Sequence, residues 1–244
     1  MACLIAAPNT TFPQTAILGI RTANRIIIGA DSLGHWGNDK SDIKRVCKIV
    51  QTGNSFFALS GDLMDRSDTF NVFRIAAKSI AGDASIAGKI KKFEEVLEIE
   101  YLQFFKMVNG KDITKIQVIV FGVDRGEMTI YQRQFKIRRR SNGSHWVSIT
   151  RKQCPPRCPT AALYFSIGKH EHADKIAFGS GFWSESIIPQ QISGLIQLEM
   201  KANPLEVGGP IDILQLTKDG AEWIQKKDEC PNIQPPLKNL TTKP

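Results

Sequence analysis

One carboxylate is well placed for chemistry in this chain of 244 residues. Asp31 follows the apolar run 26–30, so a strand would carry its side chain to the mouth of a sheet. An acidic group in such a place is costly unless a cation or hydrogen-bond donors accompany it. Two interpretations stay open at this point: a reactive-site carboxylate, or an aspartate that ends a strand and caps the next turn.

Strands must position this carboxylate. Aliphatic and β-branched residues over 16–20 and 26–30 flank the polar segment Ala23-Asn24-Arg25, which favours a reversal. The pattern predicts two buried strands joined by a turn. A basic strand over 44–49 and an apolar strand over 56–60 follow, and the latter ends at Gly61 before a helical pattern.

Helices and further strands are predicted downstream. Apolar residues recur at helical spacing over 70–80 and again over 86–104, with Lys or Glu on the other faces of the second helix. Strands are expected over 116–123 and 128–137, and another helix over 183–202. The segment 138–174 is interpreted as a polar insertion loop. Amphipathic helices that follow strands need a sheet to cover.

This succession resembles β-type proteasome subunits and their bacterial ring-peptidase relatives in the N-terminal nucleophile (Ntn) hydrolase superfamily. In that family a threonine opens the first strand, Ala-Asp-Ser ends the second, and a small-residue turn starts the first helix. Thr15 and Asp31 have the family's spacing, 31 − 15 = 16 residues. Gly179-Ser180-Gly181 resembles a later turn of the family, and residues 207–213 with 217–220 resemble its closing strands.

The resemblance implies an α+β fold, a four-layer αββα sandwich. Residues 1–14 would be a leader or propeptide, 15–225 the proteasome-like domain, and 226–244 a flexible tail. The implied activity is that of a threonine-type peptidase or amidohydrolase that acts on a peptide or an unfolded protein. The implied assembly is a homo-oligomeric ring, and neither a cofactor nor a metal is expected.

The same resemblance implies the site residues. The Thr15 hydroxyl would be the nucleophile, Asp31 and Arg45 would set the local field, and the backbone N–H at Gly61 would stabilise the oxyanion. Ser180 would help hold the terminal amine. An α-amino group has a pKa of about 8, so it accepts a proton near neutral pH only after the leader is removed.

Four residues depart from the family's pattern and support an alternative, a ring or scaffold subunit without catalytic activity. Gln14 stands where processing usually finds glycine, and Arg45 stands where the family has lysine. Pro204 and Val207 stand where active members often have aspartate and serine. Arginine keeps the charge but does not release its proton, and valine has no hydroxyl.

Composition narrows the remaining classes. Apolar residues make up 42% of the chain and charged residues 23%, which is typical of a globular protein, and no apolar run approaches membrane-spanning length. The five cysteines are an odd number, which favours free thiols in a reducing, cytoplasmic compartment over a disulfide framework.

Two other groups of side chains are weaker candidates. The net charge is +8, but the only basic cluster is 136–140 and no aromatic platform accompanies it, so nucleic acid is not expected as a partner. Cys154, Cys158, His170 and His172 could nominally bind zinc, yet their spacing is not one of the usual forms. The preferred interpretation of the basic cluster is a solvated strand end, and that of the cysteines and histidines is a polar insertion loop.

Overall fold

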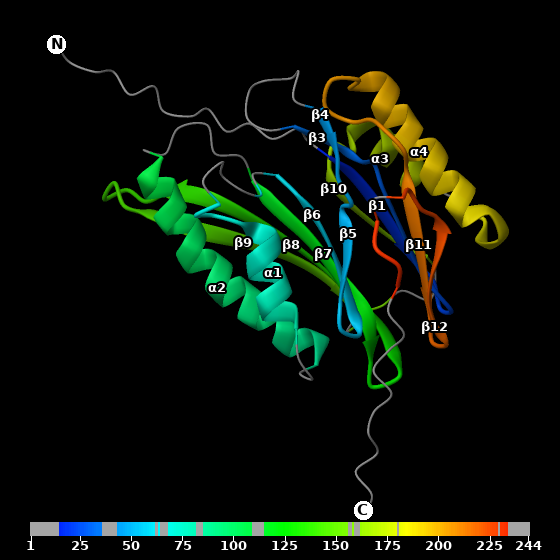
Figure 1. The fold of residues 1–244 in the computed structure, drawn as a ribbon, viewed down its shortest axis with the longest axis horizontal. Coiled ribbons are helices and arrows are strands. Elements are labelled where there is room, and N and C mark those ends of the chain that lie inside the picture. Colours follow the sequence, from blue (N-terminus) through cyan, green and yellow to red (C-terminus); the bar gives the residue numbers. More distant parts are fainter. Residues whose placement is uncertain are drawn as a thin grey trace, which may run out of the picture.

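The computed structural model describes residues 15–35, 43–61, 63, 68–81, 85–108, 115–155, 158, 162–179, 181–228 and 230–233. The predicted leader 1–14 and the end of the predicted tail, 234–244, lie outside this range. The described part is a mixed α/β fold with two five-stranded antiparallel sheets (Figure 1). None of the helices in this described part is both long enough and apolar enough to span a membrane.

Each sheet is assembled from strands that are far apart in the sequence. The first sheet has the order β10 (Leu163–Gly168), β1 (Ala16–Arg21), β2 (Ile26–Ala30), β11 (Asp212–Thr217), β12 (Gly220–Gln225). The second has the order β5 (Ile49–Thr52), β6 (Ser55–Ser60), β7 (Ile116–Asp124), β8 (Glu127–Arg139), β9 (His145–Cys154). A small third sheet pairs β3 (Leu33–His35) with β4 (Ile43–Arg45).

The predicted first two strands are confirmed, and they lie in the interior of the first sheet. Side chains alternate along β1, so that Ile17 packs toward the second sheet while Leu18 and Ile20 pack toward helices. All five residues of β2 are buried. A strand covered on both faces has no polar face, which explains the continuous apolar run in the sequence.

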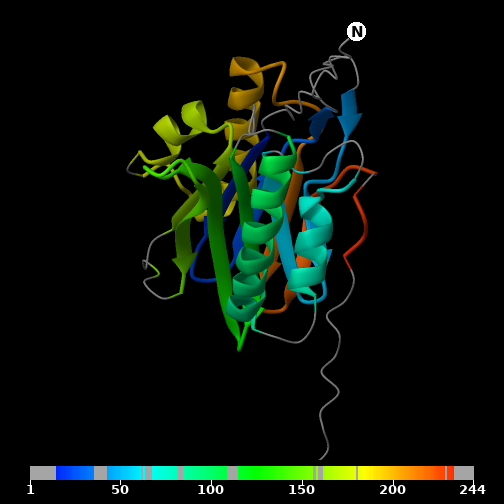
Figure 2. The same ribbon diagram turned by 90° about the vertical axis from the view of Figure 1, so that its left-hand side faces the viewer.

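Helices cover the outer faces of the two large sheets. α1 (Val72–Ile80) and α2 (Ile86–Met107) pack on the second sheet, where Phe93 and Phe135 meet edge to face. α3 (Glu171–Ala177) and α4 (Ile188–Ala202), the latter preceded by a 3₁₀ turn at Glu185–Ile187, pack on the first sheet. Figure 2 shows α1 and α2 side by side in front of the second sheet.

Capping residues define where α1 and α2, the two helices on the second sheet, begin. The side chain of Asn71 accepts a hydrogen bond from the Arg74 N–H at the start of α1. Ser85 Oγ accepts one from the Gly88 N–H at the start of α2. These bonds satisfy N–H groups that have no partner within the first turn, so both helix starts are fixed by local sequence.

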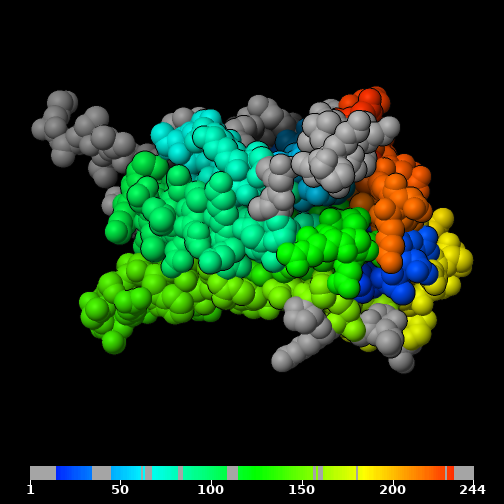
Figure 3. Space-filling model, turned by 90° about the horizontal axis from the view of Figure 1, so that it is seen from below, coloured from blue at the N-terminus to red at the C-terminus, as the bar shows by residue number. Residues whose placement is uncertain are grey.

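The predicted insertion loop over 138–174 is wrong. β8 continues to Arg139, β9 pairs with it along its whole length, and β10 and α3 follow. In β9, Val147 and Ile149 pack toward α2 while intervening polar residues face outward. A strand with one solvated face alternates polar and apolar residues, and the polar residues of such a strand have the composition of a loop. Figure 3 shows the teal-green atoms of α2 alongside the yellow-green atoms of this hairpin.

The expected free thiols are also wrong for the described cysteines. Disulfides join Cys47 to Cys230 and Cys154 to Cys158. An odd number of cysteines leaves one without a disulfide partner but does not exclude disulfides among the others. Cys47 and Cys230 are separated by 183 residues in the sequence. Only the tertiary fold brings them together.

The Cys47–Cys230 disulfide fastens part of the predicted flexible tail. Lys227, three residues before Cys230, is buried and donates from Nζ to the Asp212 carboxylate over 2.7 Å. Within this segment Lys227 and Cys230 are buried and Ile233 packs against the core between the sheets, whereas the other described residues are exposed.

A buried ion-pair network links α2 to the β8–β9 hairpin. Glu94 accepts hydrogen bonds from Arg133 Nε and, over 2.6 Å, from Arg151 Nη2. The Arg133 side chain is 4% exposed and the Glu94 side chain 12%. Burial raises the pKa of Glu94, but the hydrogen bonds from Arg151 and Arg133 outweigh it and hold the pKa below its ordinary value.

We expect Glu94→Gln to lower the free energy of unfolding at pH 7 by about 3 kcal/mol, because Arg133 stays buried without its counter-charge. The wild-type advantage is fully present above the ordinary pKa of 4.5 and is lost as the pH falls through the lowered folded pKa. Urea denaturation at pH 7 and pH 3 measures this difference. Glu95→Gln, at an exposed position, is the matched control.

An equal loss from both substitutions at pH 7, or a difference between Glu94→Gln and wild type that does not narrow at pH 3, would contradict this account of the network.

Candidate active site

Asp31 lies at the centre of a buried hydrogen-bond network at the end of β2. Its Oδ1 accepts from the Ala16 N–H over 2.9 Å and from Lys48 Nζ over 2.8 Å. Its Oδ2 accepts from the Leu33 N–H over 3.2 Å and from the Gly208 N–H over 3.0 Å. Four N–H donors around a fully buried side chain are the surroundings that an ionised carboxylate requires.

Lys48 is the cation beside Asp31. It lies in the segment between β4 and β5 and is 3% exposed. Burial lowers the pKa of Lys48, and the nearby Asp31 carboxylate only partly opposes this effect. A lysine in this position gives up a proton more readily than a lysine on the surface, so it can take part in proton transfer.

Arg45, the cation expected from the sequence, lies elsewhere. It ends β4, pairs with Leu33 in the small sheet and is exposed. The connection between β4 and β5 explains why Lys48, and not Arg45, faces the site. It is three residues long, and it turns the Lys48 side chain inward. Alignment on Val46-Cys47-Lys48-Ile49 assumed one continuous strand over this segment, which placed the cation three residues too early.

Thr15 is held next to the Asp31–Lys48 pair. It directly precedes β1 and is 3% exposed. Its carbonyl oxygen accepts from the Lys169 N–H over 2.7 Å, and the N–H of the next residue, Ala16, donates to Asp31. These two backbone hydrogen bonds therefore hold Thr15 in place, directly before the residue whose N–H binds the buried Asp31 carboxylate.

Two glycines complete the surroundings of Thr15. Gly168 has a φ of +83°, and a β-carbon there would overlap the Thr15 carbonyl oxygen and lie 2.9 Å from Ser60 Oγ. Gly61, which follows Ser60, has a φ of +112°, and a β-carbon there would overlap the Lys115 carbonyl oxygen. Both positions combine left-handed backbone with close packing, which only glycine tolerates. The Ser60 hydroxyl therefore lies near Gly168 and the Thr15 carbonyl, and Gly61 is the next residue along the chain.

A second buried ion pair, which sequence reasoning missed, lies behind Lys48. Asp212 accepts from the Lys227 N–H over 2.9 Å and from Lys227 Nζ over 2.7 Å. Both charges act on Lys48 electrostatically, Asp212 favouring its charged form and Lys227 opposing it. Asp212 is the register partner of Ala30, so it lies beside the end of β2. The sequence feature that indicates this pair is an aspartate at the start of an apolar strand.

Of the five residues predicted for the site, the structure thus places Thr15 directly before the residue that donates to Asp31, and Gly61 directly after Ser60, whose hydroxyl lies near Gly168. Arg45 lies apart from them, and Ser180 lies outside the described residues. Of the departures from the family's pattern, Pro204 is exposed, whereas Val207 is 1% exposed and packs in the core against α4.

The four candidate zinc ligands have other partners. Cys154 and Cys158 bond to each other, so neither offers a thiolate. His170 Nδ1 lies 2.8 Å from the Asp174 carboxylate, and His172 Nδ1 lies 3.3 Å from that of Glu199. In the described residues, Cys47, Asp212 and Cys230 also have ligand atoms within 4.8 Å of one another. The disulfide occupies both sulfurs of that group as well.

A comparison of the sequence with models of known protein families finds no match, and a comparison with curated proteins finds none either. The function therefore has to be argued from the site itself.

Proposed function

We propose that the chain is a threonine-type amidohydrolase or peptidase that resembles β-type proteasome subunits of the Ntn hydrolase superfamily. One observation carries the proposal: the buried Asp31 carboxylate binds both Lys48 Nζ and the N–H that follows Thr15. A hydroxyl residue, an ionised carboxylate and a lysine with a lowered pKa are the groups that activate an oxygen nucleophile.

In the proposed reaction, residues before Thr15 are first removed, which frees its α-amino group. That amine takes the proton of the Thr15 hydroxyl as Oγ1 forms a bond to the carbonyl carbon of a peptide. The N–H of Gly61 donates to the resulting oxyanion. The protonated amine then gives its proton to the leaving nitrogen as the C–N bond breaks, which leaves an ester on Thr15.

Water completes the cycle. The same amine takes a proton from a water molecule as the water oxygen attacks the ester carbonyl, and it returns the proton to Oγ1 as the ester C–O bond breaks. The charge on Lys48 stabilises negative charge that develops near Oγ1, and Asp31 holds Lys48 in place. The products are a free carboxylic acid and the regenerated threonine.

The packing supports the finer fold proposal, a four-layer αββα sandwich. One hydrophobic core lies between α1, α2 and the second sheet, a second core between the two sheets, and a third between the first sheet and α3 and α4. Three successive cores are what four stacked layers require.

The partners follow from the same resemblance. A peptide or unfolded protein is the proposed substrate and a homo-oligomeric ring the proposed assembly, without nucleic acid. A cytoplasmic location stays a prediction, and the two disulfides argue for an oxidising compartment instead.

A second candidate is a ring or scaffold subunit that hydrolyses nothing. Val207 favours it, since this buried residue precedes Gly208, an Asp31 donor, and has no hydroxyl to support a terminal amine. The amino-terminal residue of the purified protein separates the two candidates. Hydrolysis requires a chain that begins at Thr15, whereas a scaffold keeps the preceding residues.

A further inference from the structure

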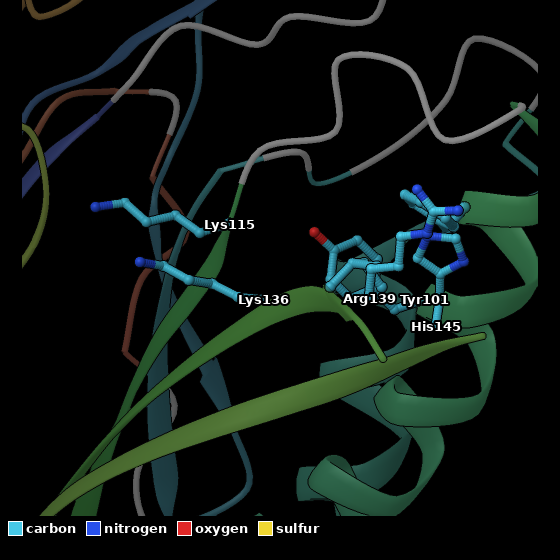
Figure 4. Close-up of a pocket in the computed structure, with 7 residues that line it drawn as sticks. Tyr101, Lys115, Lys136, Arg139 and His145 are labelled. Carbon is cyan, nitrogen blue, oxygen red and sulfur yellow. The ribbon is translucent and has the colours of Figure 1, made fainter. Parts of the chain in front are cut away.

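A basic pocket lies at the end of the second sheet, next to the candidate site. Its volume is about 410 Å³, and it is lined by Tyr101, Phe105, Lys115, Lys136, Ile137, Arg139 and His145. Figure 4 shows Lys115 and Lys136 side by side, with both ammonium groups pointing the same way and away from Tyr101, Arg139 and His145. No carboxylate lines the pocket among the described residues.

The strand register explains why the two lysines share one face. Ile116, the first residue of β7, pairs with Phe135 of β8. The same register continued by one residue places Lys115 opposite Lys136, and the charge of Lys136 acts on Lys115. Ile116 and Phe135 point into the core under α2. Because side chains alternate along a strand, Lys115 and Lys136 extend toward the face that is turned to the first sheet, whereas Tyr101 and Ile137, which also line the pocket, pack in the core under α2.

That face leads directly to Thr15. Gln117, two residues after Lys115 and on the same side of β7, accepts a hydrogen bond at Oε1 from the Gly168 N–H over 3.0 Å. Gly168 in turn lies against the Thr15 carbonyl oxygen. The carbonyl of Lys115 itself lies against Gly61, the residue proposed to stabilise the oxyanion.

The pair carries positive charge that the described residues do not neutralise. Two like charges directly opposite each other on neighbouring strands repel. Within the described part of the chain, neither Lys115 nor Lys136 forms a salt bridge. Burial, Lys136 and Lys169 lower the pKa of Lys115, and Glu171 opposes them only in part, while Lys169 pairs with Glu206 over 3.1 Å.

We propose that Lys115 and Lys136 bind an acidic side chain of the peptide substrate, so that the enzyme prefers peptides with Asp or Glu close to the bond that is cleaved. This inference rests on the proposed function and adds a substrate class to it. A carboxylate between the two ammonium groups would accept charge-assisted hydrogen bonds from both and remove their repulsion.

The test compares two peptides that differ only by Glu or Gln at one position near the cleaved bond. In the wild type, kcat/KM for the Glu peptide should exceed that for the Gln peptide by about 10-fold or more, as expected for a charge-assisted bond. Lys115→Gln and Lys136→Gln should each reduce this ratio several-fold, and the double variant should bring it close to one.

Lys201→Gln is the matched control, since Lys201 is exposed in the last turn of α4 and loses the same charge far from the pocket. It should leave the ratio at the wild-type value. A ratio near one in the wild type, or a ratio that the Lys115 and Lys136 variants leave unchanged, overturns the inference.

A binding experiment distinguishes a wrong substrate preference from a wrong proposed function. Fluorescence anisotropy of the labelled peptides is measured with full chains that carry Thr15→Ala, which do not consume the probe. Tighter binding of the Glu peptide that depends on Lys115 and Lys136 supports the inference even where the wild type cleaves neither peptide. Equal binding of the two peptides overturns the inference even where both are cleaved.

Discussion

Thr15→Ala abolishes peptide hydrolysis, with an expected loss in kcat of at least about 1,000-fold. Alanine leaves the backbone bonds of Thr15 to Lys169 and of Ala16 to Asp31 intact, but it removes the hydroxyl that attacks the substrate. Thr15→Ser keeps both the hydroxyl and the terminal amine, so it should retain activity within about 10-fold of wild type. Initial rates on a fluorogenic peptide measure these differences.

Thr150→Ala is the matched control for Thr15→Ala, because it removes the same atoms from an exposed position on β9. It should leave the rate unchanged. Thermal unfolding of all three variants tests whether the fold is intact. Wild-type rates in a correctly folded Thr15→Ala protein would show that another group performs the hydrolysis, and the mechanism would be wrong.

Lys48→Met should abolish activity while Arg45→Gln should not. Lys48 is the buried partner of Asp31, whereas Arg45 is exposed at the end of β4. Removal of the Lys48 charge also leaves Asp31 buried without its cation, which should lower the free energy of unfolding by about 3–5 kcal/mol. Arg45→Gln should change it by less than about 0.5 kcal/mol.

A double variant separates the role of Lys48 in catalysis from its role in folding. Lys48→Met with Asp31→Asn removes both buried charges, so most of the lost stability should return without any return of activity. Peptide hydrolysis and urea denaturation of the single and double variants measure both effects. Loss of activity in Arg45→Gln, together with an active Lys48→Met, would restore Arg45 as the site cation and contradict the geometry described above.

The parts of the fold that sequence alone predicts are those fixed by local pattern. Continuous apolar runs identified β1 and β2, and helical spacing of apolar residues identified α1 and α2. Asp31 was found because a carboxylate directly after a buried strand needs partners, and the structure supplies four donors.

The parts that sequence alone misses depend on contacts between distant residues. Lys48 rather than Arg45 faces Asp31 because of the path between β4 and β5, which no local pattern encodes. The Asp212–Lys227 pair and the Cys47–Cys230 disulfide likewise form only when the carboxyl-terminal strands return beside β2. The β9 strand was missed for a different reason: its solvated face is as polar as a loop.

The intact mass and the amino-terminal residue of the purified protein test the central claim most directly. We predict a chain that begins at Thr15, because the mechanism needs the α-amino group of that residue to take the hydroxyl proton. A chain that still carries the residues before Thr15 after long incubation would contradict the claim. Thr15 would then be an internal residue with an amide in place of the general base, and a scaffold would be the function to pursue.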